Sequence, residues 1–241
     1  MAADVAQLDR LPAQMHLPVQ HYADLIREVV GGHAHSLTFY GAIVAGTFEP
    51  EIHTAQNVLV LDTVDLRGLR TLSEHGPTLG KSNIAAPLIM TPAYIKDSLD
   101  TFPLELLEIS QQHVTVFGDD VFANLSFDES HMRLQCEREL KRVLIGMRQS
   151  LLAAAGREEF VDQIEANVAS TLMRTLRGML WLKGTRDPQP AAAVIEQVEP
   201  LVDRKLAGVR LAIQTHTTHD WDHFESLYHD VEKLGEVVDA W

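Results

Sequence analysis

Two glycines and the apolar run that follows them form the pattern in this sequence with the clearest chemical meaning. Gly41 and Gly46 bracket a turn that follows the β-favouring residues Thr38–Tyr40, and the apolar run Asn57–Leu61 comes next. This pattern predicts a strand, a glycine turn with a short helix, and a central strand. Glycine lets a backbone approach a phosphate closely, and the N-terminus of a helix favours an anion. The chemistry that such a stretch supports is phosphate binding.

The stretch from Phe39 to Val60 resembles the opening of the nucleotidyltransferase superfamily, which includes DNA polymerase beta and the kanamycin and lincosamide nucleotidyltransferases. That family has a strand, a glycine followed by serine or glycine at a helix start, and then an acidic–apolar–acidic triplet that leads an apolar strand. The resemblance places Gly41 on the family glycine, Ala42 on the residue after it, and Gly46 on the small residue of the turn.

The acidic triplet is the part of the family pattern that this chain lacks. In the family the two carboxylates hold divalent metals, which align the triphosphate and activate the attacking hydroxyl. Here the triplet falls on Ala55-Gln56-Asn57. Alanine cannot bind Mg²⁺, and a neutral amide is a weaker ligand than a carboxylate. The other acids nearby are out of register: Glu49, Glu51 and Asp62. We therefore expect Gly41, Ala42, Gly46 and Asn57 to form a vestigial nucleotide loop, with no catalytic residue and no metal ligand.

Later passages extend the resemblance to an uncharacterised bacterial group of nucleotidyltransferase-like proteins. They include Pro87–Met90, Phe102–Glu105, the turn at Gly118–Asp120 and Leu134–Leu140. The resemblance implies an α+β fold, in which a small mixed β-sheet domain over residues 1–127 precedes an α-helical bundle over residues 128–241.

Other groupings have simpler interpretations. His219 and His223 are four residues apart, with His216, Asp220 and Asp222 nearby, so they suggest either a metal site or a solvated helix start. Cys136 is expected to be a buried thiol. Gly76–Ser82 has three residues between its glycines, where a Walker loop has four, and is expected to be an ordinary loop. Basic residues on the two long helices suggest an anion site or solvated faces paired with Glu137, Glu139 and Glu158.

Hydrophobic periodicity and turn signals predict the helices and strands that carry these residues. In the first half we expect helices at Leu17–Val30, Leu66–Leu72 and Pro92–Leu99, a helical turn at Val121–Leu125, and strands at Ser36–Tyr40, Asn57–Leu61, Ala86–Met90, Leu104–Ile109 and His113–Phe117. In the second half we expect helices at Glu129–Ala155, Glu158–Leu182 and Trp221–Val238. Ala191–Val198 and Leu201–Ile213 are expected to form either one helix or two broken pieces, because Pro200 interrupts the pattern.

Composition limits the classes of function. The 241 residues are 46% hydrophobic and carry a net charge of −14, so a globular domain is expected, without membrane association or non-specific nucleic-acid binding. The single cysteine and the absence of a leader or an apolar span predict a cytoplasmic protein. The bundle helices carry more apolar positions than a single packing seam requires, which suggests a homodimer. Examples are Leu172, Met173, Leu176, Met179, Leu180 and Trp181.

These observations predict a nucleotidyltransferase-like protein that has lost metal-dependent catalysis and acts as a binding or interaction module. Its expected ligand is a nucleotide or another small molecule, and no cofactor is expected. The alternative is an active enzyme that moves a nucleoside monophosphate to a small-molecule or protein acceptor. Only that alternative requires Mg²⁺ and a nucleoside triphosphate, held by atypical ligands.

Overall fold

The protein divides into two compact units. The structure, a computed structural model, describes residues 5–214 and 220–241. The sheet unit comprises the chain up to Leu99 together with Leu106–Ser126. The helical unit comprises Asp100–Glu105 together with Phe127–Trp241.

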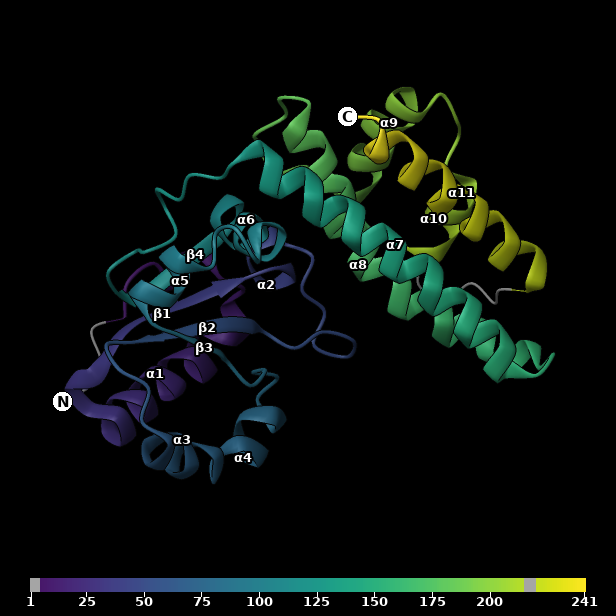
Figure 1. The fold of residues 1–241 in the computed structure, drawn as a ribbon. Helices are drawn as coiled ribbons and strands as arrows, with labels where there is room; N and C mark the ends of the chain where they lie inside the picture. The colour runs from purple at the N-terminus through teal and green to yellow at the C-terminus, as the bar shows by residue number, and fades with distance from the viewer. Residues whose placement is uncertain (1–4, 215–219) are drawn as a thin grey trace. The chain divides into compact units, whose positions relative to one another are not determined.

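The sheet unit is an α+β arrangement built around four strands (Figure 1). The strands are β1 (Ala34–Tyr40), β2 (Gln56–Leu61), β3 (Leu88–Met90) and β4 (His113–Gly118). The α-helices are α1 (His16–Val30), α2 (Ala42–Ala45), α3 (Leu66–Ser73), α4 (Gly76–Lys81), α5 (Pro92–Asp97) and α6 (Pro103–Gln111), whose first three residues group with the helical unit. Short 3₁₀ turns lie at Leu8–Arg10, Ala13–Met15 and Gly31–His33.

The four strands form one mixed sheet in the order β3-β2-β1-β4. β1 is antiparallel to both β2 and β4, whereas β3 is parallel to β2. The central position of β2 agrees with its apolar sequence, because Val58–Val60 are fully buried. The predicted mixed sheet in the first half of the chain is therefore confirmed.

One face of the sheet is covered by α1. The helix presents Val19, Tyr22, Ala23 and Ile26, all fully buried, at the spacing of a single helical stripe. These residues share one hydrophobic core with Leu59 and other inward-facing strand residues. Figure 1 shows α5 and α6 on the opposite side of the strands from α1.

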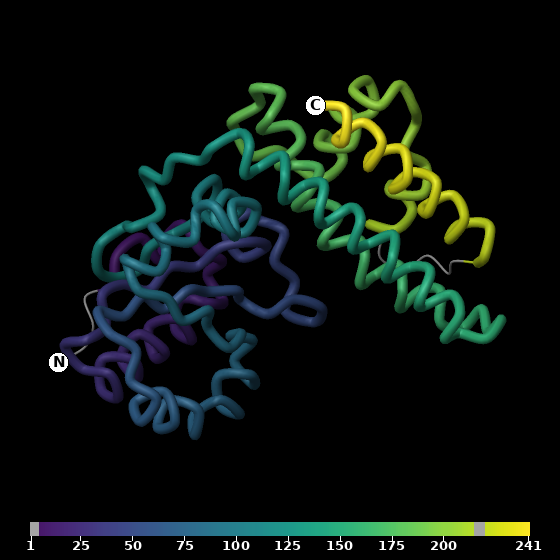
Figure 2. The backbone as a smooth tube through the Cα atoms, viewed as in Figure 1, coloured from purple at the N-terminus to yellow at the C-terminus, as the bar shows by residue number. Residues whose placement is uncertain are grey.

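The helical unit consists of helices alone in the described part of its chain. They are α7 (Glu129–Ala154), α8 (Val161–Leu182), α9 (Ala191–Val202), α10 (Ala207–Ala212) and α11 (Trp221–Asp239), with a 3₁₀ turn at Glu158–Phe160. α7 packs against α8 and α11, and α8 also packs against α9 and α10. The backbone trace in Figure 2 shows α7 and α8 running side by side. The predicted change to helical structure after residue 128 is confirmed.

The first and the last helix of the helical unit, α7 and α11, each begin at an aspartate cap. Asp128 caps α7, because its side chain accepts hydrogen bonds from the backbone N–H groups of Ser130 and His131. Asp220 caps α11, and His223 completes a capping box by accepting from the Asp220 backbone. Cys136 is fully buried, as predicted.

Two predicted segments are wrong, and both are short helices. Leu104–Ile109, predicted as a strand, lies within α6, where proline at the first position starts the helix. Its leucines and its isoleucine are all buried. Its apolar residues therefore show no clear helical period over so short a segment. Gly76–Lys81, predicted as a loop, forms α4, with Pro77 in its first turn. Its two glycines lower the helix propensity of this segment, so the sequence did not predict a helix there.

The expected two pieces are present as α9 and α10, but the helix is interrupted after Val202 and not at Pro200. The expected helical turn at Val121–Leu125 is wrong. α9 continues through Pro200 to Val202 and ends at Asp203, whose φ of 49° is left-handed. Burial of Val198, Glu199 and Val202 holds the last turn in place despite the lost backbone donor. Residues 121–125 form a turn and an irregular segment.

The apolar residues of α8 that suggested a homodimer lie inside the helical unit. All six are less than a tenth exposed, from Leu172 at 0% to Trp181 at 9%. An internal core therefore accounts for them, and the homodimer stays a prediction without this support. Within the described residues, no helix combines the length and the apolarity needed to cross a membrane.

Candidate functional site

The predicted nucleotide loop lies where β1 ends and β2 begins. Gly41 follows β1 with φ 74° and ψ −146°, a conformation that favours glycine. A Cβ atom at Gly41 would lie only 2.9 Å from Oε1 of Gln56. Ala42 begins the one-turn helix α2, and Gly46 ends it with φ 75°. The order of strand, glycine turn, short helix and strand is thus present, while its role as a nucleotide loop stays a prediction.

Asn57 has a different environment from the three loop residues. Its side chain is 2% exposed and makes three hydrogen bonds inside the sheet unit. Its Nδ2 donates to the carbonyl oxygens of Ala55 and Ala85, at 3.2 and 2.9 Å. Its Oδ1 accepts from the hydroxyl of Tyr22 at 3.1 Å. The amide is therefore a structural clamp between β2, α1 and the segment before β3.

Tyr22 and Ala55 show how fully this corner is closed. Tyr22 is fully buried, and burial raises its pKa well above the ordinary range of a phenol. Ala55 is also fully buried and forms a parallel bridge with Ile84. The backbone N–H of Ala55 donates to Asn83, and its carbonyl accepts from Ala85. Positions 55 and 57 therefore anchor the start of β2.

Strand alternation divides the start of β2 between two faces. Asn57 points toward α1, since it bonds Tyr22, and Ala55 belongs to the same core. Gln56, which is exposed, and Val58 therefore point to the opposite face. Two carboxylates that share a metal must alternate along a strand to lie on one face. Neither Ala55 with Asn57 nor Gln56 with Val58 provides an acidic residue.

The three acids near this stretch are distributed around β2. Glu49 and Glu51 are exposed in the loop between α2 and β2. Asp62 follows the other end of β2, where its Oδ1 lies 3.1 Å from Nδ1 of His35. β2 has six residues, so about 17 Å separates its first and last Cα atoms. Asp62 and the acids of the loop cannot share one metal ion across that distance.

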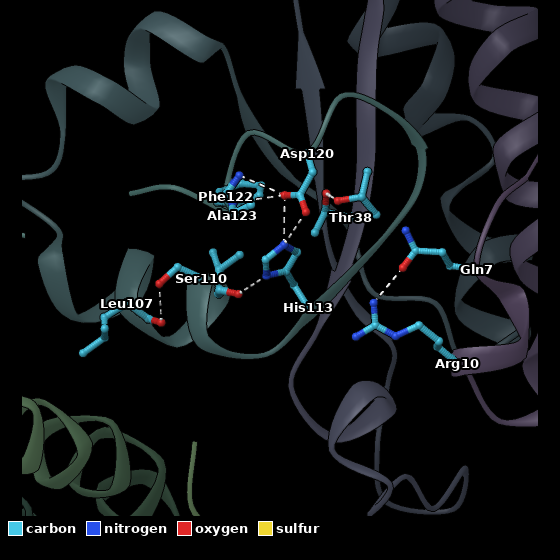
Figure 3. Close-up of polar contacts among 11 residues, drawn as sticks. Gln7, Arg10, Thr38, Leu107, Ser110, His113, Asp120, Phe122 and Ala123 are labelled. Atoms are coloured by element: carbon cyan, nitrogen blue, oxygen red, sulfur yellow. Dashed lines mark hydrogen bonds and ion pairs between the residues drawn. The ribbon is translucent and has the colours of Figure 1, made fainter. Parts of the chain in front are cut away.

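A histidine–aspartate pair that we did not predict lies on β4 and the turn after it (Figure 3). Nε2 of His113 is 2.9 Å from Oδ1 of Asp120, and its Nδ1 is 2.8 Å from the carbonyl oxygen of Ile109. Asp120 also accepts from the backbone N–H groups of Phe122 and Ala123, at 3.1 and 3.2 Å. Both ring nitrogens of His113 are engaged, so the pair stabilises the turn and offers no free base.

The sequence indicates the turn that carries Asp120 but not its contact with His113. The turn at Gly118–Asp120 is predicted by its residues, and aspartate commonly accepts backbone N–H groups two residues ahead. Nothing local indicates that the chain returns to His113 at the start of β4. Close to this pair, the hydroxyls of Thr38 and Thr115 lie 2.9 Å apart across β1 and β4.

In the helical unit, two passages that carry the family resemblance meet in one polar network. Oε1 of Gln135 accepts from the backbone N–H of Leu104, and Nε2 of Gln135 donates to Glu105, at 3.0 and 2.9 Å. Arg174 donates to the other oxygen of Glu105 at 3.2 Å. This network explains why Asp100–Glu105 group with the helical unit.

The remaining candidates have structural partners or fall outside the description. Glu137 pairs with Arg133 and Lys141, as the solvated-face interpretation expected. Asp220 and His223 form the helix cap, whereas His216 and His219 lie outside the described residues. Among the residues that the structure does describe, no group of three or more His, Cys, Asp or Glu side chains could hold a metal ion.

Comparison with known proteins adds no family assignment. No protein-family model and no curated protein matches the sequence of this chain.

Proposed function

We propose that this chain is a nucleotidyltransferase-like protein that has lost metal-dependent transfer and acts as a binding or interaction module. The resemblance around Gly41 provides the family hypothesis. The absence of acidic residues at positions 55–58 provides the inference of lost catalysis. That second observation carries the proposal, because it does not depend on which face of β2 the metal would use.

The chemistry of the transfer explains why this absence is decisive. Moving a nucleoside monophosphate to an acceptor requires a cation that bridges the phosphates and neutralises charge as the bond breaks. Mg²⁺ is held mainly by carboxylates and phosphate oxygens. Ala55 and Val58 provide no ligand atom, Asn57 uses its amide inside the fold, and Gln56 is neutral. Binding of an organic ligand at the Gly41 turn needs none of these carboxylates.

The alternative, an active transferase, would have to recruit acids from elsewhere. Glu51 is the first candidate on the loop side, and Asp62 is the first at the far end of β2. Since β2 separates them, the alternative predicts that only one of the two acids takes part. Single substitutions Glu51→Gln and Asp62→Asn then distinguish the candidates if activity is found.

Thermal stability with Mg²⁺ and ATP, alone and together, tests the proposal. A ligand that binds only the folded protein raises the melting temperature. We expect Mg²⁺ and ATP together to raise it no more than the sum of their separate effects. A joint effect larger than that sum by about 2 °C or more would show metal-dependent nucleotide binding and contradict the proposal.

A variant of the loop shows where any ATP effect arises. Gly41→Ala places a Cβ against Gln56 and strains a residue with φ 74°, so it should abolish binding at the turn. Gly32→Ala is the matched control, because Gly32 has open space around it and lies outside the loop. An ATP effect that survives Gly41→Ala comes from another site.

A further inference from the structure

A small cavity lies at the end of the sheet away from the Gly41 turn. It has a volume of about 200 Å³ and is lined by residues of α1, β2 and α3. Its apolar walls are Val29, Val30, Leu61 and Leu69. The rest of the lining is Asp65 and Gly68 on the α3 side, His33 after α1 and Thr63 after β2. Clefts for drug-sized ligands measure about 300–1,000 Å³, so this cavity suits one side chain.

Exposed apolar residues adjoin this cavity. Val64 and Leu66 flank Asp65 in sequence, and they are 48% and 77% exposed. Leu66 is the first residue of α3, whose inward face carries Gly68, Leu69 and the buried Leu72. An apolar hollow beside exposed apolar residues is the usual form of an anchor pocket in a protein interface.

Three aspartates and two histidines, His33 and His35, lie in or beside the cavity, and the exposed Arg67 precedes Gly68 on α3. Asp65 lines the cavity, and Asp62 directly follows Leu61 at the end of β2. Asp119 is joined to Asp62 through His35, whose two ring nitrogens lie 3.1 Å from Asp62 and 3.7 Å from Asp119. The side chain of Asp119 is 87% exposed. The whole chain carries a net charge of −14, so its field also favours a cationic partner.

We propose that this cavity, which we call the α1–α3 pocket, binds a basic segment of a partner protein that inserts one leucine-sized side chain. The apolar walls remove the anchor from water, and Asp62, Asp65 and Asp119 attract lysine or arginine residues beside it. The pocket lies at the opposite end of β2 from the Gly41 turn. The inference therefore holds whether or not that turn binds a nucleotide.

Short peptides provide a defined probe for the pocket. The first is acetyl-Gly-Lys-Leu-Lys-Gly-amide, the second replaces its leucine by alanine, and the third replaces its lysines by glutamates. Amide resonances of isotope-labelled protein report binding at Val29, Leu61 and Leu69. One anchor side chain should give a dissociation constant of about 0.1–1 mM. We expect the alanine and glutamate peptides each to bind about tenfold more weakly.

Two glycine substitutions test whether binding occurs in the pocket. Gly68→Leu should fill the pocket and weaken the leucine peptide about tenfold or more. A Cβ at Gly68 meets only Asp65, at 3.8 Å, so the helix accommodates it. Gly80→Leu in α4 is the matched control, because Gly80 is also helical, with open space around it, and does not line the pocket. Leu66→Ser on the exposed border is a second variant that leaves the core unchanged and should weaken binding.

Three results would overturn the proposal. The first is an absence of localised shifts with the leucine peptide at about 5 mM. The second is equal binding of the leucine and alanine peptides, or undiminished binding by Gly68→Leu. The third is a shift of the pocket resonances when the protein alone is diluted, since a second copy would then occupy the pocket.

Discussion

Removing the Asn57 side chain should destabilise the sheet unit substantially. Asn57→Ala leaves the fully buried Tyr22 hydroxyl without its acceptor and the Ala85 carbonyl without the donated amide. The Ala55 carbonyl still accepts from the backbone of Ala85. Each polar group inside the fold that loses its partner costs about 1–3 kcal/mol, so the loss of two partners should lower the free energy of unfolding by about 2–6 kcal/mol.

Urea unfolding followed by circular dichroism, with hydrogen exchange over β1 and β2, measures this loss. The matched control is Gln56→Ala, which changes the exposed neighbour and should alter stability by less than about 0.5 kcal/mol. Tyr22→Phe removes the other partner, and the double mutant should show a coupling of about 1 kcal/mol. If Asn57→Ala costs less than about 1 kcal/mol, the clamp interpretation is refuted.

Asn57→Asp extends the same prediction to the family hypothesis. The new carboxylate would be buried and would face two carbonyl oxygens, so its pKa should rise above the usual value near about 3.9. Since the folded pKa then exceeds the unfolded pKa, stability should decrease as the pH rises from about 4 toward neutrality. Mg²⁺ should not restore it. Recovery with millimolar Mg²⁺ would mean that position 57 does face a metal site.

Three further predictions concern the helical unit. Gly208→Ala should cost about 2 kcal/mol or more, because a Cβ there would lie 2.2 Å from the backbone nitrogen of Leu227; urea unfolding measures it. Burial, together with the charges of Asp162 and Asp220, raises the pKa of Glu165 to about 7. The stabilisation present below pH 4.5 should therefore be lost as the pH rises through about 7, and Glu165→Gln should flatten this dependence of the urea midpoint. Burial raises the pKa of the Cys136 thiol to about 12, so a thiol reagent at pH 8 should label it only after unfolding; fast labelling of the native protein would contradict its burial.

Tryptophan emission suits the Glu165 experiment. All three tryptophans lie in the helical unit, so their emission follows the unit that contains Glu165. A midpoint that does not change with pH, or a Glu165→Gln variant with the same slope as the unmodified protein, would contradict the assigned titration.

Long periodic segments and the central strands could be predicted from the sequence. α1, α7, α8 and α11 show helical stripes several turns long, and β2 is a continuous apolar run between polar turns. Such patterns show which side chains must be buried, so the structure that they predict is also found in the folded protein. α6 and α4 are too short for a stripe to develop. α6 buries its apolar residues, whereas α4 buries none of its six residues.

The candidate site could be located but not described in detail. The glycines of the turn indicated its place because positive φ angles restrict the residue type. The sequence could not predict which face of the sheet the Asn57 side chain points to, since a register shift of one residue moves a side chain to the other face. Its partner Tyr22 is 35 positions away along the chain. Only the fold could bring these two groups together.

The central claim is that the start of β2 holds no divalent ion beside the Gly41 turn. Paramagnetic Mn²⁺ broadens amide resonances near it, so a titration with Mn²⁺ and ATP tests the claim without knowledge of the acceptor. We expect no selective broadening at Gly41, Gln56 and Val58. Selective broadening of these three resonances that requires both Mn²⁺ and ATP would contradict it.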